Sequence, residues 1–283
     1  MRKQVRNDNV TLATEAFGDP SDPPLVMIMG ATASMHWWPT ELCKALADSG
    51  RFVIRYDNRD TGASTACPPG EPDYAVEDMA DDLIAILDAY GIARADLCGM
   101  SLGGLIAQIA ALTWPARIGQ LILIGSEPLG WEGDPLPSLA PVFLDHLENF
   151  ATLDWSDRAA VIAFQLEGAR LSSGTGAPFD PVLETAKIET ELDCSPDPRT
   201  AFNHGALTLR DDWTGAVSRI PQPALILHGR DDPILPLPNG EALAATIPDA
   251  RLTILEGVGH ELPPRALPQI VEEITGFLTD APA

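Results

Sequence analysis

The sequence has few basic residues for its length, and it lacks the patterns that mark several classes of protein. Its 283 residues include 18 Lys and Arg against 41 Asp and Glu, which gives a formal net charge of −23. A surface of this sign repels phosphate groups, so the composition argues against a nucleic-acid partner and against anionic membranes. No metal-ligating cluster or phosphate-binding loop is recognised, and we therefore predict neither a metal nor a cofactor.

Cysteine is also scarce, and long apolar runs are missing. The four cysteines are scattered and form no C-x-x-C pair, so we interpret them as free thiols in a reducing compartment. The positively charged amino terminus has no apolar stretch behind it, and no run reaches 18 apolar residues. We therefore expect a cytoplasmic protein without an export signal or a membrane span. No feature of the sequence indicates an oligomeric state.

Short apolar runs alternate with longer helical patterns along most of the chain. Strands are predicted at 24–30, 52–56, 95–100, 118–124, 224–228 and 252–255, and helices at 41–49, 74–90, 102–112 and 267–278. Strands that alternate with helices predict an α/β fold, with a mostly parallel sheet covered by helices on both faces.

Residues 130–215 interrupt this alternation, because they contain no convincing strand. Only helical segments are predicted there, at 139–150, 158–171, 182–192 and 200–209. An insertion at the carboxyl end of such a sheet lies where ligands bind, so the pattern predicts a helical lid. The expected domains are a core of residues 1–129 and 216–283 and a lid of residues 130–215.

The clearest chemical signal is Gly99-x-Ser101-x-Gly103, which lies between a predicted strand and a predicted helix. A serine on a sharp turn between strand and helix has a strained backbone, and side chains two residues to either side would clash across the bend. The turn lifts the hydroxyl of Ser101 above the sheet and places it at a helix N-terminus, which favours developing negative charge. Ser101 is the predicted nucleophile.

A serine nucleophile requires a base and a carboxylate that orients the base. His260 lies in a Gly-rich loop directly after the last predicted strand, and Asp232 follows the fifth. Asp231 is a neighbouring rival for the acid, and Glu127 is a weaker candidate after the fourth strand. The chain order of Ser101, Asp232 and His260 is that of the hydrolases whose serine lies on such a turn.

Two backbone N–H groups are needed to stabilise the oxyanion of an acyl-transfer reaction. Leu102, directly after the nucleophile, supplies one. The second is predicted at Ala31, in the loop after the first buried strand, where Gly30 permits a turned backbone. Losing one such donor typically costs about 3–4 kcal/mol of transition-state stabilisation.

Tryptophans are concentrated in the segments around the predicted cleft. Five of the six lie in the insertion or in the segment that connects the first predicted strand, through the oxyanion loop, to the first predicted helix. This distribution favours an apolar, aromatic substrate pocket, for which we select Gly30, Trp37, Trp38, Trp131 and Trp155.

These motifs together resemble the α/β-hydrolase superfamily. The resemblance rests on the serine turn, on the Gly-x-x-Asp-Pro and Gly-x-Gly-His segments, and on the pattern of Asp57, Arg59, Gly62 and Ser64. More narrowly, residues 55–62 and 173–180 resemble the aclacinomycin methylesterases. That family removes the methyl group of a carbomethoxy ester on a polycyclic polyketide, and it has Gly where this chain has Ala31.

The resemblance implies an α/β-hydrolase fold and assigns the triad roles to Ser101, Asp232 and His260. The predicted function is a serine carboxylesterase that acts on a small-molecule substrate, a methyl or other small alkyl ester of a bulky apolar acyl group. A lactonase, an aminopeptidase, a carbon–carbon bond hydrolase and a cofactor-free perhydrolase remain alternatives, because the same triad serves all of them.

Overall fold

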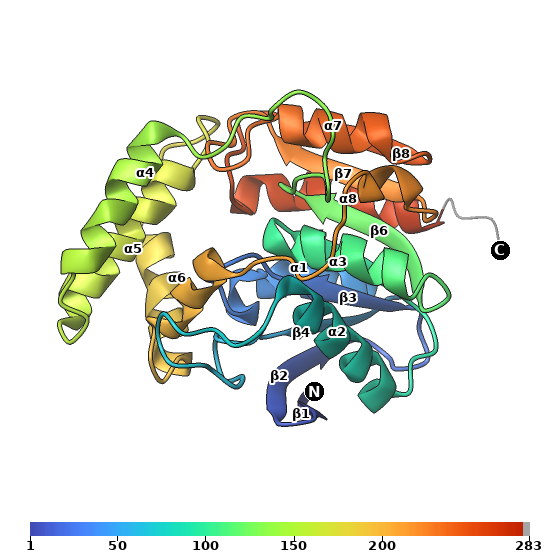
Figure 1. Cartoon of the computed structure of the whole chain (residues 1–283), viewed down its shortest axis with the longest axis horizontal. Helices are drawn as coiled ribbons and strands as arrows, with labels where there is room; N and C mark the ends of the chain where they lie inside the picture. The colour runs from blue at the N-terminus through green and yellow to red at the C-terminus, as the bar shows by residue number, and fades with distance from the viewer. Residues whose placement is uncertain (280–283) are drawn as a thin grey trace.

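Eight strands form one sheet, in the order β1-β2-β4-β3-β5-β6-β7-β8 (Figure 1). The computed structural model describes residues 1–279. The strands are β1 (Arg2–Asn7), β2 (Val10–Phe17), β3 (Pro24–Ile28), β4 (Phe52–Tyr56), β5 (Ala95–Met100), β6 (Ile118–Ile124), β7 (Ala224–Gly229) and β8 (Ala250–Leu255).

The six strands β4, β3, β5, β6, β7 and β8 pair in parallel. At one edge, β2 pairs antiparallel with β4, and β1 pairs antiparallel with β2. Every residue of β4, β6 and β7 is buried. Strands covered on both faces need nearly continuous apolar sequence rather than alternation, which is why these segments could be recognised as short apolar runs.

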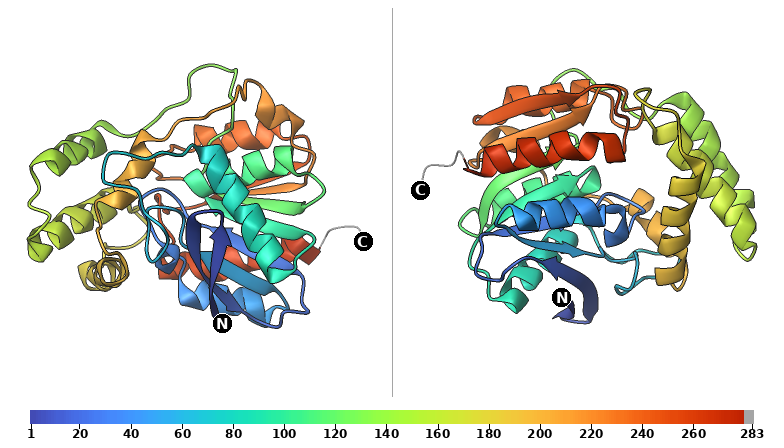
Figure 2. Two further views of the ribbon diagram at one scale, coloured as in Figure 1. Left: turned by 60° about the horizontal axis from the view of Figure 1, so that its bottom comes forward. Right: turned by 180° about the vertical axis from the view of Figure 1, so that it is seen from behind.

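Helices cover both faces of the sheet, as Figure 2 shows. The helices are α1 (Thr40–Asp48), α2 (Val76–Tyr90), α3 (Leu102–Thr113), α4 (Pro141–Glu148), α5 (Arg158–Ser172), α6 (Pro181–Cys194), α7 (Pro238–Thr246) and α8 (Leu267–Thr279). One hydrophobic cluster joins α2, α3 and α7 to the sheet, and a second joins α1 and α8 to it. The predicted parallel sheet with helices on both faces is confirmed.

Two strands and one α-helix were not predicted from the sequence: β1, β2 and α7. Only one residue of β1, Val5, is buried, because this strand forms the exposed edge of the sheet. Its sequence is therefore polar and carries no apolar run. Helix α7 begins with Pro238, Asn239 and Gly240, which together signal a loop rather than a helix.

We call residues 130–215 the inserted segment. It contains α4, α5 and α6 with 3₁₀ helices at Asn149–Thr152 and Thr200–Ala206, and its described residues include no strand. Figure 1 shows these helices to one side of the sheet, on the connection from β6 to β7. The predicted helix at 200–209 is instead the short 3₁₀ helix. The division into core and lid stays a prediction.

No helix within residues 1–279 is long and apolar enough to span a membrane.

Candidate active site

Ser101 lies on the turn between β5 and α3, with a backbone φ of 52°. Such a positive φ is strained for a residue with a side chain. A Cβ atom on Gly99 would lie 2.2 Å from the carbonyl oxygen of Gly103, and one on Gly103 would lie 2.1 Å from that of Ile28. The backbone approaches itself too closely at both positions for any residue except glycine. At Gly99 the clash lies across the bend, as predicted, but at Gly103 it is with the end of the neighbouring strand β3.

Asp232 and His260 lie in contact at the ends of β7 and β8. The Nδ1 atom of His260 is 2.7 Å from the Oδ2 atom of Asp232, whose side chain is fully buried. The other carboxylate oxygen accepts hydrogen bonds from the N–H groups of Ile234 (2.9 Å) and Leu235 (2.8 Å). Backbone donors thus hold the carboxylate in place. A carboxylate on Nδ1 leaves Nε2 of the ring as the basic nitrogen.

Neither rival acid makes a hydrogen bond to His260 within the described residues. The carboxylate of Asp231 accepts a hydrogen bond from the backbone N–H of Thr175 at 2.9 Å, on the surface of the inserted segment. Burial raises the pKa of Glu127, which lies after β6. The loop geometry thus pairs His260 with Asp232 and not with its neighbour in sequence.

The backbone at Ala31 and Leu102 has the features expected of an oxyanion hole. Neither N–H group donates a hydrogen bond to another residue in the described part of the chain. A Cβ atom on Gly30 would lie 3.1 Å from Cβ of Ser101 and 3.7 Å from its Oγ, so the loop passes directly beside the serine. Two unengaged donors near a serine can stabilise negative charge that develops there.

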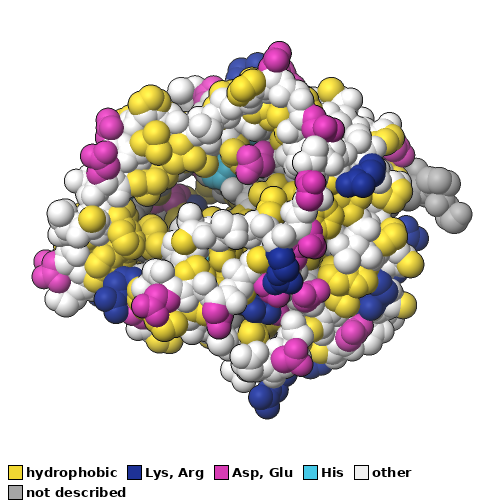
Figure 3. All heavy atoms as spheres, in the orientation of Figure 1, with side chains coloured by type: hydrophobic (Ala, Val, Ile, Leu, Met, Phe, Trp, Pro, Cys, Tyr) yellow, Lys and Arg dark blue, Asp and Glu magenta, His cyan; other side chains and the backbone are white. Residues whose placement is uncertain are grey.

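Ser101, His260, Gly30 and Ala31 lie on the wall of a cavity of about 460 Å³. Figure 3 shows a hollow lined mainly by hydrophobic side chains, with a histidine visible inside it. The hydroxyl of Ser101 and the ring of His260 make no hydrogen bond to each other in this structure. Bonds of this kind often shorten only when substrate is bound.

The inserted segment supplies most of the apolar wall opposite the serine. Its apolar side chains on the cavity wall are Leu139, Phe143, Leu147, Phe164, Ala169 and Phe202. The ring of Phe164 stacks on His146 with a centroid distance of 4.4 Å. A cavity of this volume and lining suits a bulky apolar or aromatic group.

Several polar groups of the same wall were not recognised in the sequence. The Oε1 atom of Gln165 is buried and has no hydrogen-bond partner. Lys187 forms an ion pair of 2.7 Å with Glu184, and Glu191 accepts a hydrogen bond from Oγ of Ser34 at 2.5 Å. No motif surrounds these residues, and only the packing of α5 and α6 against the core places them at the cavity.

Of the residues selected for the pocket, Gly30 and Trp37 lie on its wall. Trp38 does not: its side chain is fully buried in the hydrophobic cluster formed with α1, beside Leu42 and Leu46. The two tryptophans are adjacent, but one faces the cavity and the other the core.

Trp131 and Trp155 also lie away from the cavity wall. The Nε1 atom of Trp131 donates a hydrogen bond to the carbonyl oxygen of Asp134 at 2.8 Å, in an exposed loop. Trp155 packs edge-on against Phe150 and Phe202, with centroid distances of 5.0 and 5.5 Å, and so supports the wall from behind. Their positions depend on how the inserted helices pack, which sequence position alone does not determine.

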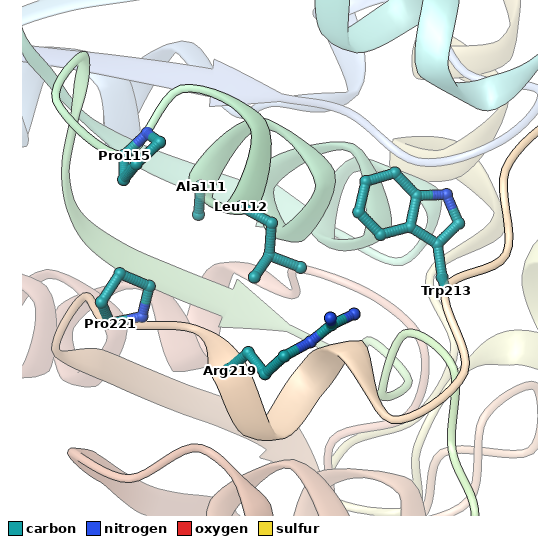
Figure 4. Close-up of a pocket in the computed structure, with 6 residues that line it drawn as sticks. All are labelled: Ala111, Leu112, Pro115, Trp213, Arg219 and Pro221. Atoms are coloured by element: carbon teal, nitrogen blue, oxygen red, sulfur yellow. The ribbon is translucent and has the colours of Figure 1, made fainter.

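Trp213 lines a separate depression that lies between α3 and residues 216–221 (Figure 4). Its volume is about 370 Å³, and it is lined by Ala111, Leu112, Pro115, Trp213, Arg219 and Pro221. None of the predicted catalytic residues contributes to it. Among residues 1–279, no group of three His, Cys, Asp or Glu side chains is placed to hold a metal ion.

A family model described as the alpha/beta hydrolase fold matches residues 23–264. The chain belongs to this family. Among solved structures, a hydrolase from Pseudomonas aeruginosa PA01 is 26% identical, covers 98% of both chains and superposes with a TM-score of 0.73. The enol-lactonase from Burkholderia xenovorans LB400 is 22% identical, with a TM-score of 0.78 over 98% of this chain and 100% of that one, and shows the fold alone.

Two curated relatives indicate where this α/β-hydrolase lies within the family. The rhodomycin D methylesterase DnrP of Streptomyces peucetius is 33% identical over 276 residues, which are 92% of each chain. The 3-oxoadipate enol-lactonase 2 of Acinetobacter baylyi is 25% identical and covers 94% of this chain and 93% of its own. The predicted fold class and the predicted resemblance to methylesterases are therefore confirmed.

Proposed function

We propose that this α/β-hydrolase is a serine carboxylesterase, which hydrolyses a methyl or other small alkyl ester of a bulky apolar acyl group through an acyl-enzyme. The observation that carries the proposal is the 2.7 Å contact of His260 with the buried Asp232, on the wall of the apolar cavity that also contains Ser101. The similarity to methylesterases supports the enzyme class, a carboxylic ester hydrolase.

In the first half of the reaction, Oγ of Ser101 attacks the ester carbonyl carbon while Nε2 of His260 takes the hydroxyl proton. Asp232 holds the ring by Nδ1 and stabilises the imidazolium. The carbonyl oxygen becomes an oxyanion, which the N–H groups of Ala31 and Leu102 bind. When the carbonyl re-forms, the C–O bond to the alkoxy group breaks, and His260 returns the proton to the leaving alcohol.

In the second half, water attacks the carbonyl carbon of the acyl-enzyme, and His260 takes its proton. The same two N–H groups bind the second oxyanion. Its collapse breaks the bond to Oγ of Ser101, which regains a proton from His260, and the carboxylic acid is released. These steps require only groups of the chain, water and the ester.

For the inserted segment we propose the role of a lid that covers the acyl group. Its support is the wall of apolar side chains that face the serine, including Phe143, Phe164 and Phe202. A large apolar group that leaves water for this wall gains roughly 25 cal/mol per Å² of buried apolar surface. A methyl alcohol portion is too small to fill the cavity, so we assign the cavity to the acyl portion. A cytoplasmic location is proposed from the four free thiols.

The lactonase alternative is supported by the enol-lactonase among the relatives. The aminopeptidase alternative has less support. It requires an acid free to bind the substrate amine, yet the acids that line the cavity are each engaged. Glu184 pairs with Lys187, Glu191 with Ser34, and Glu261 accepts a hydrogen bond from the N–H of Gly174.

A substrate panel tests the proposal. The wild type and Ser101→Ala are assayed on methyl naphthoate, methyl acetate, an aromatic lactone and an amino-acid arylamide. We expect the highest kcat/KM on methyl naphthoate, and a loss of roughly 10⁴-fold or more in the variant, because the nucleophile is gone. Equal turnover by the variant, or a preference for the arylamide, would contradict the proposal.

A further inference from the structure

We propose that His204, in the inserted segment, is a positioning residue that holds the oxyanion loop (residues 29–34) in the conformation in which the Ala31 N–H can bind the oxyanion. The inference rests on the proposed esterase mechanism, and it adds a role in the chemical step for a segment otherwise assigned to substrate binding. Its basis is a part-buried hydrogen bond between two parts of the chain that are 172 residues apart in sequence.

The ring of His204 bridges two backbone groups of the core. Its Nδ1 atom accepts a hydrogen bond from the N–H of Thr32 at 3.1 Å, and its Nε2 atom lies 2.8 Å from the carbonyl oxygen of Arg59. An accepting Nδ1 places the proton on Nε2, which then donates to Arg59. The ring is therefore neutral. It is also buried, and burial lowers its pKa, which keeps it neutral.

The contact lies at a strained point of the oxyanion loop. Thr32 has a φ of 63°, which is unfavourable for a β-branched residue and persists only where surrounding contacts enforce it. The N–H that His204 holds belongs to the peptide that joins Ala31 to Thr32. Fixing this peptide fixes the orientation of Ala31, whose own N–H is one peptide earlier.

Within residues 1–279, side chains of the core make hydrogen bonds to the loop backbone at its two ends. Nδ2 of Asn58 donates to the carbonyl oxygen of Met29 at 3.0 Å, and Oδ1 of Asp57 accepts from the N–H of Met35 at 2.8 Å. Between these ends, the side chains that hold the loop backbone come from the inserted segment. His204 binds Thr32, and Glu191 accepts from the N–H of Ser34 at 3.1 Å.

Without the ring, the strained peptide loses its acceptor and a part-buried N–H loses its partner. The loop can then relax away from the conformation in which Ala31 faces the serine. Removing an oxyanion donor outright typically lowers kcat about 10²–10³-fold. For a donor that is displaced rather than removed, we expect a loss of about 10–100-fold in kcat, with KM within about twofold of the wild type.

Two matched variants separate the two hydrogen bonds of the ring. In His204→Asn, the side-chain oxygen lies near the position of Nδ1 and can still accept from Thr32. In His204→Gln, the amide nitrogen lies near the position of Nε2 and can still donate to Arg59, but the bond to Thr32 is lost. If His204 positions the oxyanion loop, His204→Asn should keep its activity and His204→Gln should lose it. If His204 only connects the inserted segment to Arg59, the opposite result is expected.

The test measures kcat and KM of both variants on methyl naphthoate, together with the affinity for an aryl trifluoromethyl ketone. That ketone forms an oxyanion on Ser101, and a non-covalent naphthyl ketone serves as its reference. We expect His204→Asn to stay within about threefold of the wild-type kcat. His204→Gln should lose about 10–100-fold in kcat and in affinity for the trifluoromethyl ketone, but not in affinity for the reference ligand.

The proposal is overturned if His204→Gln keeps the wild-type kcat, if the loss lies in KM alone, or if a folded His204→Asn loses kcat. Where the Gln variant fails to fold, the Asn variant can still overturn the proposal by losing kcat, because only the contact to Thr32 is left in it. A wild type without esterase activity would contradict the proposed function instead. If the wild type is active and neither variant loses kcat, the proposed role of His204 is contradicted but the proposed function is not.

Discussion

The two walls of the cavity are built in different ways. On the core side, Ser101 and Asp232 follow the buried strands β5 and β7, and His260 follows the partly buried edge strand β8. Every residue of the neighbouring strand β6 is buried. On the other side, helix α4 buries one of its eight residues, His146, and leaves Val142 and Leu144 about half exposed. We propose that the buried core side carries the chemistry and that the more exposed side determines which acyl group fits.

This contrast predicts that substitutions at the predicted catalytic residues or in the buried core change kcat or stability. Substitutions of the side chains that line the cavity, many of them in the inserted segment, should instead change KM. His204 is the expected exception, because it contacts the oxyanion loop.

The largest effect is expected at Asp232. Replacing the carboxylate in Asp232→Asn removes the acceptor that orients His260, and kcat should fall about 10⁴-fold. The matched control is Asp231→Asn, which alters an exposed contact with Thr175 and should leave kcat within about twofold. Steady-state kinetics on methyl naphthoate measure both. A comparable loss in the two variants would contradict the assignment of the acid.

The adjacent tryptophans offer a second comparison. Trp38→Ala opens a hole in the core and should lower the free energy of unfolding by about 3–5 kcal/mol. Trp37→Ala removes a side chain that faces the cavity, so it should cost less stability and raise KM instead. Urea denaturation and initial rates measure the two effects. A larger loss of stability in Trp37→Ala, or a raised KM in Trp38→Ala alone, would contradict the placement of the two rings.

A smaller effect is expected at Phe164, whose ring lines the cavity. Phe164→Ala should raise KM for methyl naphthoate about 10–100-fold, since a lost aromatic contact is worth about 1.5–3 kcal/mol. It should change KM for methyl acetate little, because the small acyl group does not reach the ring. Phe150→Ala is the control, since Phe150 packs behind the wall against Trp155. Equal shifts for both esters would contradict the assignment of the cavity to the acyl group.

The smallest effect is a pH dependence at Glu191. Burial, together with the charge of Asp57, raises the pKa of Glu191 to about 7, although its contacts with Ser34 favour the ionised form. Because the folded-state pKa lies above the unfolded value, this carboxyl contributes stability below pH 4.5 that is lost as the pH rises through 7. Burial likewise raises the pKa of Asp57 to about 6.

Glu191→Gln cannot titrate and can still accept from Ser34. Relative to the wild type, we expect this variant to gain on the order of 1–3 kcal/mol of stability between pH 5 and pH 8. We follow the difference between the two denaturation midpoints across this range. Asp57 titrates in both proteins, so the difference reports on Glu191 and on its interaction with Asp57. If the stability of Glu191→Gln relative to the wild type stays constant with pH, or falls as the pH rises, the raised pKa of Glu191 is ruled out.

The core could be predicted from the sequence because its signals are local. Gly99 is required by a contact within its own turn, and buried parallel strands appear as short apolar runs. The need for Gly103 comes instead from the close approach of Ile28 on the neighbouring strand β3, although the motif still marks the position. The roles of Asp232 and His260 could be predicted because each residue lies in a loop directly after a predicted strand. The edge strand β1 was missed because its exposed side chains give no apolar pattern.

The opposite wall could not be predicted in the same way. Trp155 and Phe164 lie on the same cluster of rings, yet only Phe164 reaches the cavity, and that choice depends on how α5 packs against Phe202. The contact of His204 with Thr32 joins distant parts of the chain and has no motif around it. Both outcomes depend on tertiary structure rather than on spacing in the sequence.

The most direct test of the catalytic assignment is mass spectrometry of the acyl-enzyme. The protein is mixed with a naphthoate aryl ester, quenched in acid within the first turnovers, and digested for peptide mapping. The account predicts a naphthoyl adduct on the peptide that contains Ser101, absent in Ser101→Ala and more persistent in His260→Ala if it forms there. Turnover of the ester with no adduct on Ser101, or with the adduct on another residue, would contradict it.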